Sequence, residues 1–321
     1  MMAMKHVCYT LVCVCCMGLW ACKDKPSPSG DPKTDMYAAS DTEDANSIIT
    51  YNNAMIQLDD KRRSYLERVI SNVSKVEEGL ENPSSKLAFA VLMSPIYIAP
   101  IQRPGTSTDT PPSALETDDR DFFTSKGEEV SDKFDAIRES YKRLDEYVKA
   151  EDYKDDGGRK GNEIIDELIV LLEEYYTLNA DLHRRLAVVS DGAERKILQD
   201  HPLKSYIFAA KDDFRAIDEF IKTGEAQGGS YAEHEAVFRE KYDALETAHK
   251  KHSEMSPEGM KDYAGKEASF ARFNEAVNSF LVTARRIMRD AASSGQLSDR
   301  QLEALSDEMN SVRNAYNHFV D

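Results

Sequence analysis

The segment at residues 263–291 reads YAGKEASFARFNEAVNSFLVTARRIMRDA. Its large apolar residues recur at alternating spacings of three and four, so they share one side of an α-helix. A stripe that keeps this period over about four heptads is typical of the seam between helices in an antiparallel bundle. The members of this stripe are Tyr263, Phe270, Phe273, Val277, Phe280, Ala284, Ile287 and Ala291.

Two further stripes with the same period lie in residues 48–80 and 165–189. Three seams of this length outweigh any strand interpretation, and they predict an all-α fold, an elongated antiparallel bundle of about seven helices. The first stripe consists of Ile48, Met55, Leu66, Val69, Val73, Val76 and Leu80, and the second of Ile165, Leu168, Leu172, Tyr175, Leu182, Leu186 and Val189.

Capping signals place the helix boundaries. A hydroxyl or carboxylate before a helix, with Glu or Gln three residues on, satisfies free N–H groups of the first turn. Such signals occur at Ser125, Asp191, Ser230 and Ser298, and Ser256-Pro257-Glu258 adds Pro at the first helical position. We place helices near residues 45–80, 126–151, 160–190, 193–223, 230–254, 257–293 and 299–319.

Charge and composition narrow the function classes. The 321-residue chain has 41 Lys and Arg residues against 58 Asp and Glu, which gives a net charge of -17 at pH 7. A nucleic-acid binder needs a basic face that neutralises phosphates, so nucleic acid is excluded as a partner. With 41% apolar residues, the chain is too polar for a protein with several membrane spans, yet apolar enough to bury a core.

The first 22 residues hold all five cysteines and are typical of an export leader. Lys5 precedes an apolar run, 7–20, that is too short to span a bilayer as a helix. The run leads into Leu19-Trp20-Ala21-Cys22, which resembles the bacterial lipobox, and the resemblance implies that the thiol of Cys22 is acylated. The alternative is an ordinary signal peptide in which Cys22 is incidental.

The sequence therefore predicts three parts of the chain: a lipoprotein signal peptide at 1–21, the lipidated Cys22 with a flexible tether at 22–44, and a helical bundle domain at 45–321. The tether is rich in Pro, Ser and charged residues and cannot bury enough apolar surface to fold. The expected location is the bacterial cell envelope, where the N-terminal lipid holds the protein on a membrane and the domain faces the periplasm.

Residues 87–101, LAFAVLMSPIYIAPI, form an apolar run without charge, and a flexible Thr/Pro/Ser/Asp-rich loop is expected at 104–119. The run is too short and too broken by prolines to be a transmembrane helix. One interpretation is a segment plugged into the bundle core. The other is an exposed apolar patch or lid that docks a partner, lipid or ligand.

Three short pieces together resemble a family of exported bacterial lipoproteins that carry an all-helical domain of unknown function. The pieces are Tyr51-Asn52 with Ile56 following, the acidic turn with Tyr147, Asp152-Tyr153, Asp155-Asp156 and Gly161, and the C-terminal Asn278-Ser279-Phe280-Leu281 and Tyr316-Asn317-His318-Phe319. The resemblance covers nearly all of 45–321. It implies the fold and the location, and it brings no catalytic residues.

The acidic turn is the first candidate binding site. Asp152, Asp155 and Asp156, just before Gly157-Gly158, put three carboxylates in one turn, as the binding of a hard cation requires. Their spacing differs from the alternating Asp-x-Asp-x-Asp-Gly of a calcium loop. A solvated acidic turn between helices is therefore the favoured interpretation.

Tyr51 and Asn52 are the second candidate. They place an amide beside an aromatic ring on an otherwise apolar helix face, where a buried Asn must find hydrogen-bond partners and can fix the register of a bundle. This role is favoured over contact with a ligand. Asn179, and Asp59 with Arg62, are expected to act likewise.

His249 and His252 lie three residues apart on one helix, where two imidazoles could share a metal ion. Lys250 and Lys251 beside them indicate instead a cationic helix end, which the helix dipole favours. No metal or other cofactor is expected. No nucleophile-elbow motif occurs, and the mature chain keeps no Cys besides Cys22.

The first hypothesis is thus a non-enzymatic, lipid-anchored helical protein that binds an envelope protein or a small ligand. The alternative is an envelope enzyme with a carboxylate- or His-based site inside the bundle. A third hypothesis is a structural spacer, in which the helices only set a distance.

Overall fold

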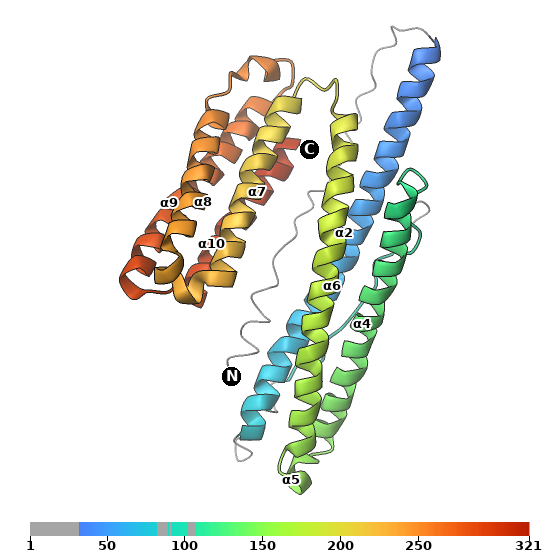
Figure 1. Ribbon diagram of the computed structural model, residues 1–321, viewed down its shortest axis with the longest axis vertical. Helices are drawn as coiled ribbons and strands as arrows, with labels where there is room; N and C mark the ends of the chain where they lie inside the picture. Colours follow the sequence, from blue (N-terminus) through green and yellow to red (C-terminus); the bar gives the residue numbers. More distant parts are fainter. Residues whose placement is uncertain (1–31, 82–88, 90–91, 102–106, 321) are drawn as a thin grey trace. The chain divides into compact units, whose positions relative to one another are not determined.

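The computed structural model describes residues 32–81, 89, 92–101 and 107–320 (Figure 1), and all regular secondary structure in these ranges is helical. Seven long helices confirm the predicted all-α fold. They are α2 (Pro32–Glu81), α4 (Thr117–Lys149), α6 (Arg159–Ile197), α7 (Lys204–Gln227), α8 (Tyr231–Ser253), α9 (Lys266–Ser294) and α10 (Asp299–Val320). The short elements are α5 (Tyr153–Asp156) and two 3₁₀ turns, η1 (Gly228–Ser230) and η2 (Pro257–Met260).

The chain divides into two compact units near residue 196. The range 45–321, treated as one domain on sequence grounds, therefore folds as two bundles with separate cores. Among the described residues, α2, α4, α5 and α6 belong to the first unit, and the helices from α7 onward belong to the second. No helix in the described ranges has a stretch long and apolar enough to cross a membrane.

The first unit is a bundle of three long helices. Arg62 on α2 donates to Ser131 on α4 at 2.6 Å, and Asn72 donates to Tyr141 at 2.6 Å. Because both contacts join residues 69 positions apart, α2 and α4 run parallel in constant register. The chain returns between them through an extended segment, visible beside α4 in Figure 1. The predicted apolar stripes of α2 and α6 supply nearly half of the buried core, and α4 adds a further share that includes Phe123, Phe134 and Leu144.

The second unit is a four-helix bundle in which each helix packs against the next, and α10 closes the ring against α7. Successive helices are joined by short connections, so neighbours run antiparallel. The stripe predicted in residues 263–291 is buried along α9 apart from Tyr263, which precedes the helix and is partly exposed. Aromatic rings fill the interior, and the largest are those of Tyr231, Tyr316, Phe220, Phe238, Phe273, Phe280 and Phe319.

Several helix ends differ from the predicted ones. Helix α2 begins at Pro32, inside the stretch 22–44 that was expected to be a flexible tether, and proline is well suited to the first helical position because its missing N–H needs no partner. Helix α4 begins at Thr117, inside the expected loop 104–119, with Asp118 and Asp119 in its first turn, where the helix dipole favours carboxylates.

Two sequence signals that predict the start of a long helix do not start one. Asp191 was expected to begin a helix, but α6 continues to Ile197, and the chain breaks only around Pro202. Ser256 does accept a hydrogen bond from the N–H of Glu258, but it begins only η2. Helix α9 starts later, after Gly265, whose φ of 81° is a backbone conformation that favours glycine.

Asp59 connects α2 to α6 inside the first unit. Its Oδ1 accepts from Asn179 Nδ2 at 2.8 Å, and His183 Nε2 lies 3.6 Å from its Oδ2. The hydrogen bond between Asn179 and Asp59 joins two of the residues that were expected to fix the register of the bundle. Burial alone would raise the pKa of Asp59, but hydrogen bonds from His183 and Asn179 and nearby positive charge hold it below its ordinary value.

Because the pKa of Asp59 is lowered in the folded protein, the stability of the fold depends on pH. The stability that Asp59 contributes is complete above its unfolded pKa of about 3.9 and is lost as the pH falls through its lower folded pKa. We expect the free energy of unfolding to drop as the pH falls below about 4, and we expect Asp59→Asn to flatten this drop while costing about 1–3 kcal/mol at pH 7. Urea unfolding across this range checks the slope. Asp60→Asn, an exposed neighbour, is the control, and equal slopes for Asp59→Asn and wild type would contradict the assignment.

Candidate functional site

Residues 92–101, here called the strap, form an extended segment along α2 and α4. Asn72, which is fully buried on α2, holds its backbone. The Nδ2 of Asn72 donates to the carbonyl of Met93 at 2.7 Å, and the N–H of Met93 donates back to Asn72 Oδ1 at 3.4 Å. The amide thus binds the strap as a neighbouring strand would, and its second donor is used by the hydroxyl of Tyr141.

Tyr97 anchors the middle of the strap. Its ring lies edge-on to Phe134 at 4.8 Å and to Tyr65 at 6.4 Å between ring centroids, so it fills a gap between α2 and α4. The guanidinium of Arg138 lies over the ring of Tyr97, 5.4 Å from its centroid, as in a cation–π contact. The strap is therefore fixed at two points, Met93 by hydrogen bonds and Tyr97 by packing.

The outer face of the strap is apolar and open to solvent. In an extended chain successive side chains point to opposite sides, so Ile96 and Ile98, the neighbours of the partly buried Tyr97, point outward. Met93 and Ile101, each four residues from Tyr97, are exposed as well. Met93 is 58% exposed, Ile96 76%, Ile98 71% and Ile101 89%. Each of the two interpretations of 87–101 therefore describes part of the segment, because Leu92 and Tyr97 pack against the core while the four side chains above are exposed. Residues 87, 88, 90 and 91 lie outside the described ranges.

The acidic turn has a structural role at Asp156. This carboxylate accepts from the hydroxyl of Tyr147 at 2.7 Å and from the N–H groups of Gly158 at 2.9 Å and Lys160 at 3.1 Å. Asp156 thereby ties the end of α4 to the start of α6. The Tyr147 hydrogen bond, together with the two backbone N–H groups, lowers the pKa of Asp156, and burial followed by the same contact raises the pKa of Tyr147.

The other two carboxylates of the turn lie apart from this network. Asp155 is exposed, and Asp152 is partly buried. In the part of the chain that the structure describes, no group of three or more His, Cys, Asp or Glu side chains is arranged to hold a metal ion.

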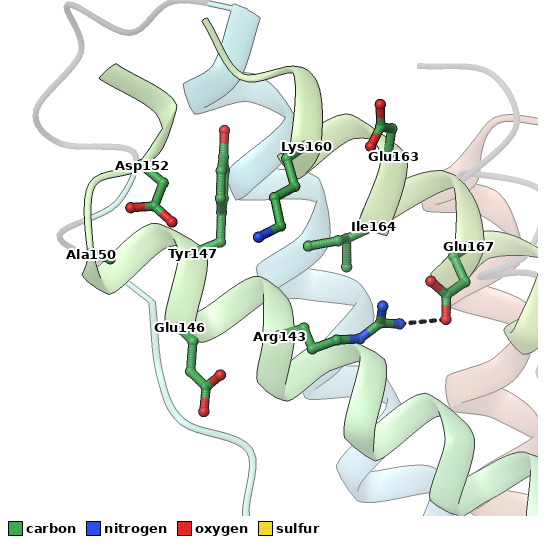
Figure 2. Close-up of a pocket in the computed structure, with 9 residues that line it drawn as sticks. All are labelled: Arg143, Glu146, Tyr147, Ala150, Asp152, Lys160, Glu163, Ile164 and Glu167. Carbon is green, nitrogen blue, oxygen red and sulfur yellow. Dashed lines mark hydrogen bonds and ion pairs between the residues drawn. The ribbon is translucent and has the colours of Figure 1, made fainter. Parts of the chain in front are cut away.

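A pocket of about 420 Å³ lies beside this turn, between the last turns of α4 and the first turns of α6 (Figure 2). Helix α4 and the turn after it contribute Arg143, Glu146, Tyr147, Ala150 and Asp152 to its lining. Helix α6 contributes Lys160, Glu163, Ile164 and Glu167. Only Asp152 among these was a candidate from sequence. The signal that could have found the others is their spacing of three and four, which places each set on one helix face.

Tyr51 and Asn52 are both buried in the first unit, near the start of the described core. The ring of Tyr51 lies edge-on to Phe123 at 5.8 Å between centroids, and burial raises the pKa of its hydroxyl. Within the described ranges, neither the Tyr51 hydroxyl nor Asn52 Oδ1 has a hydrogen-bond partner. These residues do not line the pocket beside the acidic turn.

Replacing Asn52 with Leu should leave the fold intact. The amide makes only a long contact, 3.4 Å to Asn53 Oδ1, while its own oxygen is buried without a partner. Removing an unsatisfied buried polar group for an apolar one of similar size is nearly neutral or stabilising, within about 1 kcal/mol. Circular dichroism with thermal unfolding measures the outcome. Clear unfolding of the variant would show that Asn52 has a partner essential to the fold.

His249 and His252 on α8 share a carboxylate from α7. The Nδ1 atoms of the two rings lie 2.7 Å from the two oxygens of Asp213, whose side chain is fully buried. The sequence candidates thus meet an acid that sequence reasoning missed, although Asp213 stands in the apolar stripe of Ala210, Phe214 and Ile217. The trio ties two helices together inside the second unit, with the carboxylate closed to solvent.

The structure is that of an all-α protein with two helical bundles and an apolar strap held against the first bundle. The chain belongs to the family described as a protein of unknown function (DUF3829), whose model matches residues 125–321. This agrees with the expected uncharacterised helical family. Cys22 and the lipobox lie outside the described residues.

Two solved structures resemble the chain in fold. An alpha helical protein from Bacteroides fragilis matches with a TM-score of 0.58 and 14% identity, over 85% of this chain and 98% of that one. An uncharacterised DUF3829-like protein from Bacteroides thetaiotaomicron matches with a TM-score of 0.50 and 17% identity, over 84% of this chain and 96% of that one. No curated protein matches the sequence.

Proposed function

We propose that the protein is a non-enzymatic, lipid-anchored component of the bacterial cell envelope that binds a protein partner through the outer face of the strap. Binding through the strap is supported by its exposed apolar side chains, which stand on a backbone that Asn72 and Tyr97 hold in place. These side chains are Met93, Ile96, Ile98 and Ile101. The lipid anchor rests on the lipobox resemblance at Cys22.

Energetics support the strap as a binding surface. Fully burying one isoleucine side chain is worth about 1.5–3 kcal/mol, and three of them are exposed within six residues. Association also costs conformational entropy, because flexible groups at the interface become ordered. Because the strap is already held by hydrogen bonds and ring packing, that cost is largely met before a partner arrives.

Charge favours a protein partner over a membrane surface. The chain carries a net charge of -17, and anionic lipids repel an acidic body that approaches their headgroups. Membrane residence is also supplied elsewhere in the proposal, because several acyl chains on Cys22 are sufficient for stable anchoring. The apolar strap is therefore left available for a protein.

The anchor is tested by intact mass and by fractionation. Mass spectrometry of the native protein should find an acylated N-terminus at Cys22. Cys22→Ser should move the protein from the membrane fraction to the soluble fraction, or leave it as an unprocessed precursor. An unmodified N-terminus at another residue would refute the lipid anchor, but it would not affect the proposal that the strap binds a protein.

The binding surface is tested by a triple variant, Ile96→Ser, Ile98→Ser and Ile101→Ser, compared with Val170→Ser and Val188→Ser. All five side chains are more than half exposed, so each replacement should change stability by less than about 0.5 kcal/mol. Quantitative copurification from solubilised envelope should show one protein that the strap variant loses and the valine variant keeps. Identical copurification patterns for the two variants would refute the strap as the binding surface.

A further inference from the structure

The pocket between α4 and α6 contains an unusual balance of charge. Two of its lining residues are paired to each other, Arg143 to Glu167 at 2.5 Å. A third, Glu163, is paired to Arg159 at 2.8 Å just outside the lining. The charges of these residues are therefore already balanced by a neighbouring side chain.

Three other charged residues line the pocket without such a pair. In the part of the chain that the structure describes, no hydrogen bond or ion pair is found for the Lys160 ammonium or for the carboxylates of Glu146 and Asp152. Figure 2 shows Lys160 and Ile164 directed toward the space beside Tyr147, with Asp152 on the other side of that ring. The uncompensated charges are thus one positive and two negative, from opposite walls.

The floor of the pocket is apolar and fixed. Tyr147 and Ile164 are both buried, at 3% and 5% exposure. The hydroxyl of Tyr147 is already used by Asp156, so the ring offers a surface rather than a donor. Gly161 lies so close that an added Cβ would sit 2.6 Å from the ring, which leaves Tyr147 little room to turn. A volume of about 420 Å³ suits a small molecule rather than a polymer.

We propose that this pocket binds a free basic α-amino acid such as arginine. Its carboxylate pairs with Lys160, its ammonium and side-chain cation pair with Glu146 and Asp152, and its aliphatic chain lies on Tyr147 and Ile164. The net charge of the ligand, +1, complements the -1 of the three uncompensated groups. The acidic body of the protein also raises the local concentration of cations.

The test is calorimetric titration of the full-length protein in detergent with L-arginine, agmatine and L-norleucine. Agmatine lacks the carboxylate, and norleucine lacks the side-chain cation. Arginine should bind about three- to tenfold more tightly than either, the scale of one charged contact at a half-open site. Failure of arginine to bind, or equal binding of all three compounds, would overturn the proposal.

Variants assign the contacts. Lys160→Met should erase the preference for arginine over agmatine, because only the carboxylate distinguishes them, while Lys160→Arg should keep it. Glu146→Gln with Asp152→Asn should erase the preference over norleucine. Lys196→Met, at the far end of α6, is the matched control and should change nothing. A Lys160→Met protein that still prefers arginine would contradict the assigned contact. All these residues except Asp152 are exposed, so thermal unfolding should be unchanged.

Discussion

Replacing Asp213 with Ala should destabilise the four-helix unit by about 3–5 kcal/mol. Asp213 is fully buried and holds the Nδ1 atoms of His249 and His252, each at 2.7 Å. Without the carboxylate, the buried ring of His249 and the partly buried ring of His252 both lose their partner. Each unpaired polar group costs about 1–3 kcal/mol, and any positive charge on the rings adds to this.

The matched control for this prediction is Asp212→Ala. Asp212 neighbours Asp213 on α7, but it is exposed and its contact with Arg215 is a surface ion pair at 3.6 Å, so its loss should cost under about 1 kcal/mol. Hydrogen exchange measured by mass spectrometry locates the effect, which should appear in peptides of α7 to α10. Equal protection in the two variants would show that the trio contributes nothing to the second unit.

Replacing Gly161 with Ala should destabilise the first unit by about 1–3 kcal/mol, although alanine is the better helix former. The added Cβ would lie 2.6 Å from Cε1 of Tyr147 and 2.8 Å from Cδ1 of Leu80. Leu80 can move at its end, but Tyr147 is held by its hydrogen bond to Asp156. The helices must therefore separate, or the tie between α4 and α6 must break.

Gly192→Ala on the same helix should change stability in the opposite direction. No atom lies within 4 Å of a Cβ at that position, so only helix propensity changes, and stability should rise by up to about 1 kcal/mol. Thermal unfolding of the two variants should shift in opposite directions. A stabilised Gly161→Ala protein would show that the close approach of α2, α4 and α6 at this glycine is absent.

The helical seams were predictable from sequence because burial selects apolar residues at the helix period, whatever the helices pack against. The division into two units was not, since every residue near 191–197 is compatible with a helix and the break depends on Pro202 and the loop around it. The parallel course of α2 and α4 was also hidden, because it depends on where the strap lies.

The candidate site was predictable only in part. A continuous apolar run such as 87–101 has no alternation, so it does not tell a buried segment from an exposed one. The partner of His249 and His252 was missed because it comes from another helix, and only an acid within an apolar stripe indicated it. The acidic turn was found from sequence, but the three hydrogen bonds that bind Asp156 depend on how α4 meets α6.

If the strap contacts a protein in the cell envelope, a photoreactive amino acid placed at Ile98 should capture that protein in living cells. Val188, isolated on α6 and comparably exposed at 64%, is the control position. Illumination should give a discrete protein adduct at position 98 and none at position 188. An adduct with lipid alone, no adduct at 98, or the same adduct at both positions would show that the strap is not a specific contact site for a protein.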